Sequence, residues 1–291
     1  MQIAIYSRNE AGQQVVECVS QLVQRLHSRG ITAQLYEPFF RSLQQDQQRQ
    51  LSSAKLFTEI QELSPAEVVC LMSVGGDGTF LDAAALAFGT SLPLVGVNAG
   101  RMGFLPIISI DNADEMLGHI ASGSFDVEQR AMLQVDGCTG KRQYVLNEIS
   151  LQRRGASIAE INLHINGEFL NSYWADGFIV ATPTGSTAYS MSAGGPIVAP
   201  DAACLIISPI APHSLSARPI VVPDSACIAL EMMTRSGKVI VGVDSQSYEL
   251  AAGCKIAVQK AAAKISFVKF KHASFYRTLR EKLLWGVDVR G

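Results

Sequence analysis

The sequence predicts an α/β domain followed by an all-β domain, and three observations support this order. In residues 1–125, short apolar strands alternate with helical segments, which indicates a parallel sheet of the Rossmann type with helices on both faces. In residues 126–270, strand follows strand, and Asn166-Gly167 is typical of a tight hairpin turn. In residues 271–291, apolar residues return to helical spacing, and we expect this helix to pack back on the first domain.

The individual elements follow from local apolar patterns. In the first domain we expect buried strands at residues 3–6, 31–35, 67–73 and 93–97, and helices at residues 15–26, 80–87 and 111–121. Residues 39–49 are rich in glutamine and are compatible with a helix or a loop. In the second domain we expect strands at residues 131–135, 143–151, 158–165, 178–181, 204–208, 227–233, 238–243, 255–258 and 264–270.

Composition excludes several classes of protein. Charged residues make up 17% of the 291 residues and the formal net charge is -2, which argues against a basic face for nucleic acid. Apolar residues are frequent, yet no run approaches the ~20 residues of a membrane helix, and the first residues lack the basic start of a signal peptide. The six cysteines are scattered without a C-x-x-C pair, which is typical of reduced core residues in a cytoplasmic protein.

A glycine turn lies between the third strand and the next helix, with the sequence Gly75-Gly76-Asp77-Gly78-Thr79. Glycines let a ligand approach the backbone closely, and a helix N-terminus offers free N–H groups to phosphate. Asp77 is unusual there, because a carboxylate beside phosphates is repelled unless it binds a metal or accepts a proton. The same residues also fit an ordinary tight turn in which Asp77 caps the helix.

Two further polar segments follow strands or interrupt them. Residues 98–105 form a second glycine loop at the same carboxyl edge of the sheet, where Arg101 would meet phosphate oxygens or simply be solvated. Asn147 and Glu148 interrupt a strand-like run, where an amide and a carboxylate would hydrogen-bond a base edge and sugar hydroxyls. A solvated edge strand would explain the same pair.

The most informative segment is residues 182–196, which combine glycines and small hydroxyl residues between apolar strands. A helix starting near Ser186 would be N-capped and would direct its N–H groups at a ligand, and Tyr189 could stack on it. The alternative is a flexible Ser/Gly loop.

Taken together, these residues resemble the NAD kinase family. The shared motifs are G-G-D-G-T at residues 75–79, N-x-G-x-x-G-F-L at 98–105, N-E at 147–148, D-G at 176–177 and T-P-T-G-S-T-A-Y-S at 182–190. Residues 212–219 and Asp244-Ser245-Gln246 also match. The run at 182–190 is highly specific, whereas G-G-D-G-T is shared with lipid kinases and phosphofructokinases. Near Ser157 and Trp174 some members carry His or a basic residue, so we assign no direct ligand contacts at these two positions.

The resemblance implies phosphoryl transfer from ATP to the 2′-hydroxyl of the adenosine ribose of NAD, assisted by a divalent metal such as Mg²⁺. It implies that Asp77 is the general base, and that the enzyme is a homo-oligomer, most simply a homotetramer, whose neighbouring subunit completes the NAD site. No metal ligands are assigned. The substrate-binding positions that it implies are Gly75, Gly76, Gly78, Arg101, Phe104, Asn147, Glu148, Asp176, Thr187, Ala188, Tyr189, Ser190, Met191, Ser192, Ala211 and Gln246.

Two other functions share part of this pattern. A diacylglycerol-type lipid kinase shares G-G-D-G-T and a similar two-domain layout, but the run at residues 182–190 argues against it. A catalytically silent NAD-binding sensor would keep the pocket, but binding alone does not need the carboxylate of Asp77 among phosphates. Production of NADP from NAD and ATP distinguishes the three.

Overall fold

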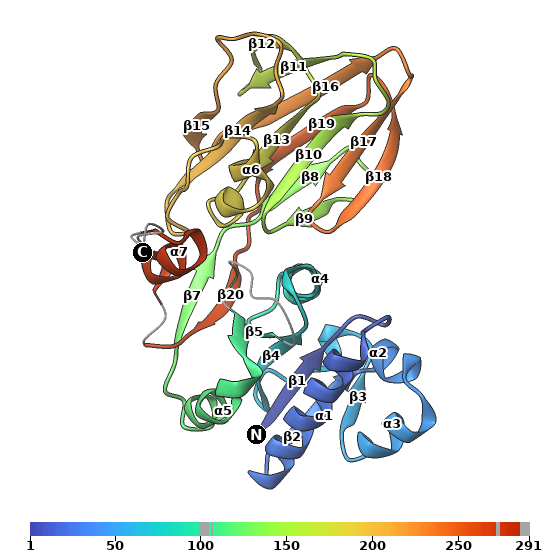
Figure 1. Ribbon diagram of the computed structural model, residues 1–291, viewed down its shortest axis with the longest axis vertical. Helices are drawn as coiled ribbons and strands as arrows, with labels where there is room; N and C mark the ends of the chain where they lie inside the picture. The colour runs from blue at the N-terminus through green and yellow to red at the C-terminus, as the bar shows by residue number, and fades with distance from the viewer. Residues whose placement is uncertain (99–104, 106, 272–273, 286–291) are drawn as a thin grey trace, which may run out of the picture. The chain divides into compact units, whose positions relative to one another are not determined.

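The computed structural model describes residues 1–98, 105, 107–271 and 274–285. The chain divides into two compact units (Figure 1). Unit 1 comprises Met1–Gln129 and Ile265–Gly291, and unit 2 comprises Arg130–Lys264. Among the described residues, no helix is long and apolar enough to cross a membrane.

Unit 1 is built on a mainly parallel sheet with the strand order β3-β2-β1-β4-β5-β20-β7, with β6 also paired to β5. Its strands are β1 (Gln2–Tyr6), β2 (Thr32–Tyr36), β3 (Lys55–Phe57), β4 (Val68–Val74), β5 (Leu94–Asn98), β6 (Ile107–Ser109), β7 (Asp126–Arg130) and β20 (Ile265–Lys269). The chain proceeds outward from β1 to β3 and then returns to place β4 on the other side of β1. The strand order therefore reverses between β1 and β4, and such a switch point is where open α/β sheets bind ligands.

Helices accompany this sheet in unit 1, and the longer ones bury apolar residues. They are α1 (Gln13–Ser28), α2 (Glu37–Ser42), α3 (Gln45–Gln50), η1 (Ile60–Glu62), α4 (Asp77–Ala87), η2 (Ile110–Asn112), α5 (Ala113–Ala121) and α7 (Phe275–Leu283). In α1, Val16, Val19, Leu22, Val23 and Leu26 are buried, as their spacing predicts. The glutamine-rich segment forms two short helices, α2 and α3, rather than a single helix or a loop. The second of them, α3, with the sequence QDQQRQ, buries no apolar residue.

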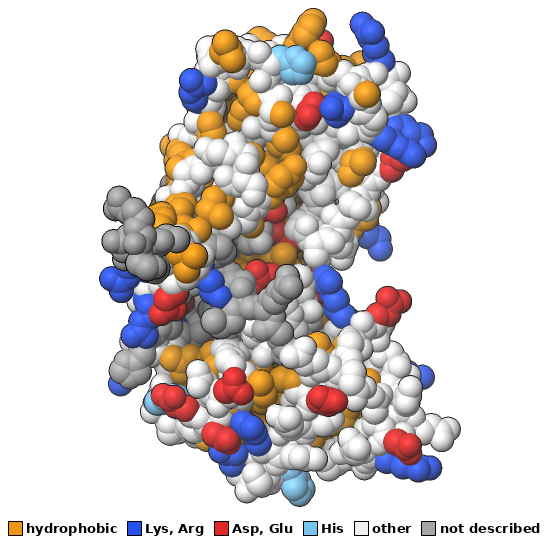
Figure 2. All heavy atoms as spheres, viewed as in Figure 1, with side chains coloured by type: hydrophobic (Ala, Val, Ile, Leu, Met, Phe, Trp, Pro, Cys, Tyr) orange, Lys and Arg blue, Asp and Glu red, His pale blue; other side chains and the backbone are white. Residues whose placement is uncertain are grey.

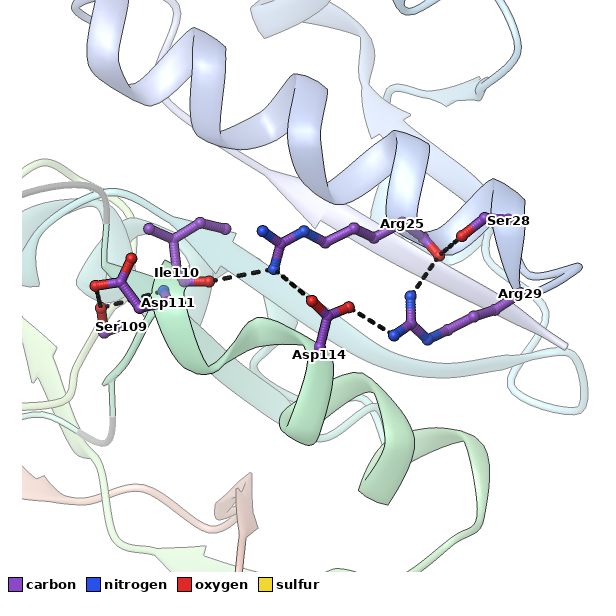
Figure 3. A network of polar contacts seen from close by, with 7 residues as sticks. All are labelled: Arg25, Ser28, Arg29, Ser109, Ile110, Asp111 and Asp114. Atoms are coloured by element: carbon purple, nitrogen blue, oxygen red, sulfur yellow. Dashed lines mark hydrogen bonds and ion pairs between the residues drawn. The ribbon is translucent and has the colours of Figure 1, made fainter.

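Ion pairs join two of these helices at the surface (Figure 3). Asp114 of α5 accepts from Arg25 of α1 at 3.2 Å and from Arg29, the residue that caps the C-terminus of α1, at 2.6 Å. Arg25 also donates to the backbone oxygen of Ile110 at 3.4 Å. Because Asp114 is largely exposed, each ion pair contributes only about 0–1 kcal/mol, and apolar packing holds the helices in place.

Unit 2 is a sandwich of two six-stranded sheets, which confirms the all-β prediction. One sheet has the order β15-β14-β13-β10-β17-β18 and the other β12-β11-β16-β19-β8-β9, and the pairings printed for both are antiparallel. The strands are β8 (Leu133–Asp136), β9 (Gln143–Val145), β10 (Glu148–Arg153), β11 (Ala159–Ile165), β12 (Glu168–Ala175), β13 (Gly177–Ala181), β14 (Cys204–Ile210), β15 (Ile220–Pro223), β16 (Ile228–Thr234), β17 (Lys238–Val243), β18 (Gln246–Ala251) and β19 (Lys255–Lys260). Alternate residues of both sheets, such as Leu151 and Leu230, form one buried core.

The last strand of the chain, β20, pairs with β5 in the sheet of unit 1. Four of its five residues are buried, which suits a strand covered on both faces. Phe267 packs edge-on against Phe80 of α4, with ring centroids 5.1 Å apart. Val268 joins the core formed with α1 and α5. The helix α7 follows within the same unit, as expected.

Candidate active site

The glycine turn lies at the carboxyl end of β4, directly at the switch point of the sheet. Gly75 has φ +152°, and a Cβ added there would lie 2.5 Å from Oγ1 of Thr79. Only glycine fits this position. Gly76 occupies the N-cap position of α4 and Asp77 is its first residue, so Asp77 is not the helix cap that an ordinary turn would require. A carboxylate in the first helical turn is favoured by the positive end of the helix dipole.

The loop after β1 holds this turn from the side. The hydroxyl of Ser7 donates to the backbone oxygen of Val74 at 3.0 Å. The guanidinium of Arg8 donates to the backbone oxygen of Gly78 at 2.9 Å and to the carboxylate of Asp82 at 2.5 Å. A Cβ on Gly78 would approach Nη2 of Arg8 to 3.0 Å, so the guanidinium lies against the turn. Sequence reasoning missed Ser7 and Arg8, whose one signal is their place after the first parallel strand.

The second glycine loop begins at Asn98, a buried residue at the end of β5. Its predicted ligand-binding residues, Arg101 and Phe104, lie outside the described residues. The strand itself pairs with β4 in parallel, so Asn98 and the glycine turn leave the same edge of the sheet.

In unit 2, Asn147 and Glu148 are held by the residues that begin the segment at 182–196. Thr182 donates its hydroxyl to the backbone oxygen of Leu146 at 2.6 Å and its N–H to that of Asn147 at 2.9 Å. A Cβ on Gly185 would lie 2.2 Å from the backbone oxygen of Asn147. Two motifs more than 30 residues apart in sequence therefore form one contact surface. The solvated-edge explanation is wrong, because β10 lies between β13 and β17.

Two acceptor atoms in this cluster are buried without a hydrogen-bond partner among the described residues. They are Oδ1 of Asn147 and Oε2 of Glu148. Buried polar atoms of folded proteins are almost always paired, so such atoms call for a functional explanation. Burial raises the pKa of Glu148 to about 8, with a further rise from the charge of Asp244 and an opposing effect from a backbone hydrogen bond of Tyr189. A ligand with hydroxyl donors would satisfy both oxygens.

The segment at 182–196 is buried over residues 182–187 and forms short helices, which argues against a flexible loop. It forms η3 (Thr184–Thr187) and α6 (Tyr189–Ser192), separated at Ala188, in place of the single helix expected from Ser186. The Ser186 hydroxyl donates to the oxygen of Val198 at 3.1 Å and accepts its N–H at 3.0 Å. These two bonds pair the buried Ser186 hydroxyl within the protein.

The remaining predicted residues of this segment differ in exposure. Thr187 is 8% exposed and Ser190 is fully buried, with its hydroxyl 3.3 Å from that of Ser208. Tyr189 is 36% exposed, so its ring is open to solvent. Met191 is half-buried and Ser192 is exposed.

The other predicted residues of unit 2 lie at opposite ends of one sheet. Asp176 and Ala211 are beside the Arg153 end of β10, whereas Gln246 is at its Glu148 end. Asp176 accepts from Nε of Arg153 at 2.6 Å, so its carboxylate already has a cation. The N–H of Asp176 donates to the backbone oxygen of Ile210 at 3.0 Å. The next residue, Ala211, has φ +44° although it is not glycine. Such a conformation is uncommon and often marks a functional position. Gln246 is exposed and accepts from the hydroxyl of Tyr248.

These features define a class of enzyme. A glycine turn with a carboxylate at a helix start, at the switch point of a parallel sheet, is the arrangement of a phosphotransferase that handles nucleotide phosphates. Comparisons with known proteins give the particular family. Residues 3–125 match the model of the ATP-NAD kinase N-terminal domain, and residues 146–270 match that of the ATP-NAD kinase C-terminal domain. The chain belongs to the NAD kinase family, and its enzyme class is that of an NAD kinase.

Individual relatives support this assignment over the whole chain. An NAD kinase of Flavobacterium psychrophilum is 42% identical over 76% of this chain and 77% of its own. One of Christiangramia forsetii is 35% identical over 100% of both chains. The yeast NADH kinase complexed with NADH superposes with a TM-score of 0.82 at 25% identity, covering 100% of this chain and 89% of its own. The NAD kinase of Archaeoglobus fulgidus in complex with ATP superposes with a TM-score of 0.75 at 26% identity, covering 98% of this chain and 99% of its own.

Proposed function

We propose that the enzyme transfers the γ-phosphoryl group of ATP to the 2′-hydroxyl of the adenosine ribose of NAD, giving NADP. The observation that carries this proposal is the pair of buried acceptors, Oδ1 of Asn147 and Oε2 of Glu148, which lack partners among the described residues. A dinucleotide brings several sugar hydroxyls and an amino group, each of which is a donor for such an oxygen. The ligands named for the two solved relatives, NADH and ATP, agree with this substrate pair.

Asp77 is the proposed general base. It is half-buried at the first position of α4, and a helix N-terminus of this kind offers backbone N–H groups to phosphate. In phosphoryl transfer a carboxylate in this setting accepts the proton of the attacking hydroxyl. The proposed NAD-binding residues are those of unit 2 that surround the buried acceptors, above all Asn147, Glu148 and Tyr189.

A divalent metal fits this donor set only as a partner of the phosphates. The described residues contain no group of three or more His, Cys, Asp or Glu side chains that could hold an ion. Mg²⁺ bound to a nucleotide needs only one or two protein carboxylates, so the residues present suffice, and Asp77 is the carboxylate that would meet it. When bound, the ion would neutralise charge on the phosphate oxygens.

The proposed enzyme is also a homo-oligomer, most simply a homotetramer. Figure 2 shows hydrophobic side chains gathered on the visible face of unit 2, whereas charged side chains are frequent over unit 1. Among the large exposed apolar residues, Phe169, Leu170 and Trp174 all belong to β12, an edge strand. Exposed apolar residues on a sheet edge favour self-association. Light scattering across a dilution series, with activity measured in parallel, tests this.

The decisive experiment for the reaction is a product assay. Purified protein is incubated with NAD, ATP and MgCl₂, and NADP is measured with an NADP-specific dehydrogenase. We expect turnover with NAD and none with diacylglycerol. NAD binding without NADP formation would favour the silent sensor, and phosphorylation of diacylglycerol would favour the lipid kinase.

A further inference from the structure

A two-residue loop in unit 2 makes a contact that the reaction above does not use. Asp244 is the first residue between β17 and β18, and it has φ +49°, which is uncommon for a residue other than glycine. Two-residue hairpin loops often need this conformation. The hairpin loop therefore accounts for the positive φ of Asp244, and glycine or asparagine would adopt this backbone conformation equally well.

The side chain of Asp244 does something that the loop does not require. Its Oδ2 accepts the N–H of Leu146 at 2.7 Å. Its Oδ1 accepts the N–H of Asn147 at 2.8 Å and that of Glu148 at 3.3 Å. Its own N–H donates to the backbone oxygen of Glu148 at 3.1 Å. One carboxylate thus collects three consecutive backbone donors nearly 100 residues away.

Only an ionised carboxylate suits this set of donors. Both of its oxygens are acceptors, and hydrogen bonds to a charged group are stronger than neutral ones. An asparagine would turn an NH₂ group toward at least one N–H, and a glycine would leave all three without this acceptor. The three donors belong to the segment that carries the unpaired oxygens of Asn147 and Glu148.

The opposite side of the same segment is fixed by Thr182, which bonds the backbone oxygens of Leu146 and Asn147. The three N–H donors of the segment therefore point to Asp244, and two of its three backbone oxygens accept from Thr182, while the oxygen of Glu148 accepts from Asp244. With its backbone held on both sides, the segment has little freedom, and its two side chains leave from fixed points. A binding site gains affinity when its contacting groups are ordered before the ligand arrives.

We propose that Asp244 is a positioning residue for NAD, which holds the backbone of residues 146–148 so that the side-chain oxygens of Asn147 and Glu148 meet the sugar hydroxyls. This inference rests on the proposed function. Asp244 acts through its neighbours. Its loss will weaken NAD binding and leave use of ATP unchanged.

Asn166 provides a matched control elsewhere in unit 2. It is also the first residue of a two-residue loop, between β11 and β12, and it has φ +53°. Its Oδ1 accepts the backbone N–H of Cys227 at 2.9 Å. Replacing Asn166 by glycine therefore removes the same kind of contact from the same backbone conformation, without touching residues 146–148.

The test compares Asp244→Gly, Asp244→Asn and Asn166→Gly with the parent enzyme, measuring kcat and KM for NAD and for ATP together with thermal melting. We expect Asp244→Gly to raise KM for NAD about tenfold or more, with KM for ATP unchanged, as the loss of charged hydrogen bonds implies. The KM of Asp244→Asn for NAD should lie between those of the parent and Asp244→Gly, and Asn166→Gly should leave KM for NAD and KM for ATP unchanged. A purely structural role would lower the amount of active enzyme, and hence kcat, without moving KM for NAD.

The outcomes separate the two proposals. If the parent enzyme makes no NADP, the proposed function fails, whatever Asp244 does. If the parent is active and Asp244→Gly has the KM for NAD of Asn166→Gly, the positioning role is refuted. If Asp244→Gly does not fold, the KM for NAD of Asp244→Asn decides by the same criterion. Failure of both Asp244 variants to fold, with Asn166→Gly folded, would make Asp244 a structural residue only and would also refute the inference.

Discussion

Replacing Glu148 by glutamine should have opposite effects on stability and on function. The carboxyl group is neutral in the folded protein over an unusually wide range, because burial raises its pKa from 4.5 to about 8. An acid whose pKa rises on folding stabilises the folded state fully below the unfolded pKa, and this stabilisation is lost as pH rises through the folded pKa. The folded protein should therefore lose stability between about pH 4.5 and pH 8 through this one residue.

The magnitude follows from the size of the pKa shift. One pKa unit corresponds to about 1.4 kcal/mol, so the rise from 4.5 to about 8 sets an upper limit of about 5 kcal/mol above pH 8. Glu148 is only half-buried, so water will screen part of this, and we expect about 1–3 kcal/mol. Glu148→Gln carries no charge at any pH. It should melt several degrees above the parent at pH 9 and close to the parent at pH 5.

Whereas Glu148→Gln should be more stable than the parent at high pH, its use of NAD should be weaker. Above pH 8, where the Glu148 carboxyl group is ionised, a neutral amide is a poorer acceptor for sugar hydroxyls than the carboxylate, and a buried charged hydrogen bond contributes about 1.5–3 kcal/mol. We expect kcat/KM for NAD to fall by about 10- to 150-fold. The measurements are thermal melting from pH 5 to pH 9 and steady-state NADP formation.

One control variant and two possible results test these predictions for Glu148→Gln. Glu168→Gln, at an exposed position that begins β12, should change neither the melting profile nor the kinetics. An unchanged kcat/KM for NAD in Glu148→Gln would remove Glu148 from the substrate site. Equal melting temperatures of parent and variant at pH 9 would show that the carboxylate is not held in a desolvated position.

Three further changes test other parts of the molecule. Asp77→Asn should lower kcat by about 10²–10⁴-fold, with NAD affinity retained in calorimetry. The control Asp114→Asn, in the first turn of another helix of unit 1, should keep normal kcat. Near-normal turnover in Asp77→Asn would refute the role of Asp77 as general base. Gly185→Ala should lower the melting temperature and NAD affinity together, because its Cβ would lie 2.2 Å from the backbone oxygen of Asn147; an unaffected variant would contradict that packing. Thiol reductant should leave the melting temperature unchanged, because all six cysteines are free, and a marked drop would point to a disulfide.

The sequence by itself determined the fold class and the position of the glycine turn after a strand of the parallel sheet. Alternation of strands and helices gives the parallel sheet, and the apolar stripe from Val16 to Leu26 gives the face that α1 buries. The glycine turn at Gly75 is also visible locally, because the conformation that needs glycine is a property of that residue. Such features depend on neighbours within a few residues, and a single sequence displays them directly.

Tertiary structure decided how distant segments meet. The sequence placed the strand at residues 264–270 in the second domain, and this was wrong, because the strand pairs with β5 and belongs to unit 1. Its apolar residues are compatible with either sheet, so only the tertiary pairing decides. Asn147 and Glu148 looked like possible edge residues until β13 and β17 enclosed them. The contacts of Asp244 with residues 146–148, and of Arg8 with Gly78, join positions about 70 to 100 residues apart. Hydrogen bonds of this kind leave no periodic signal along the chain, because only folding brings their donors and acceptors together.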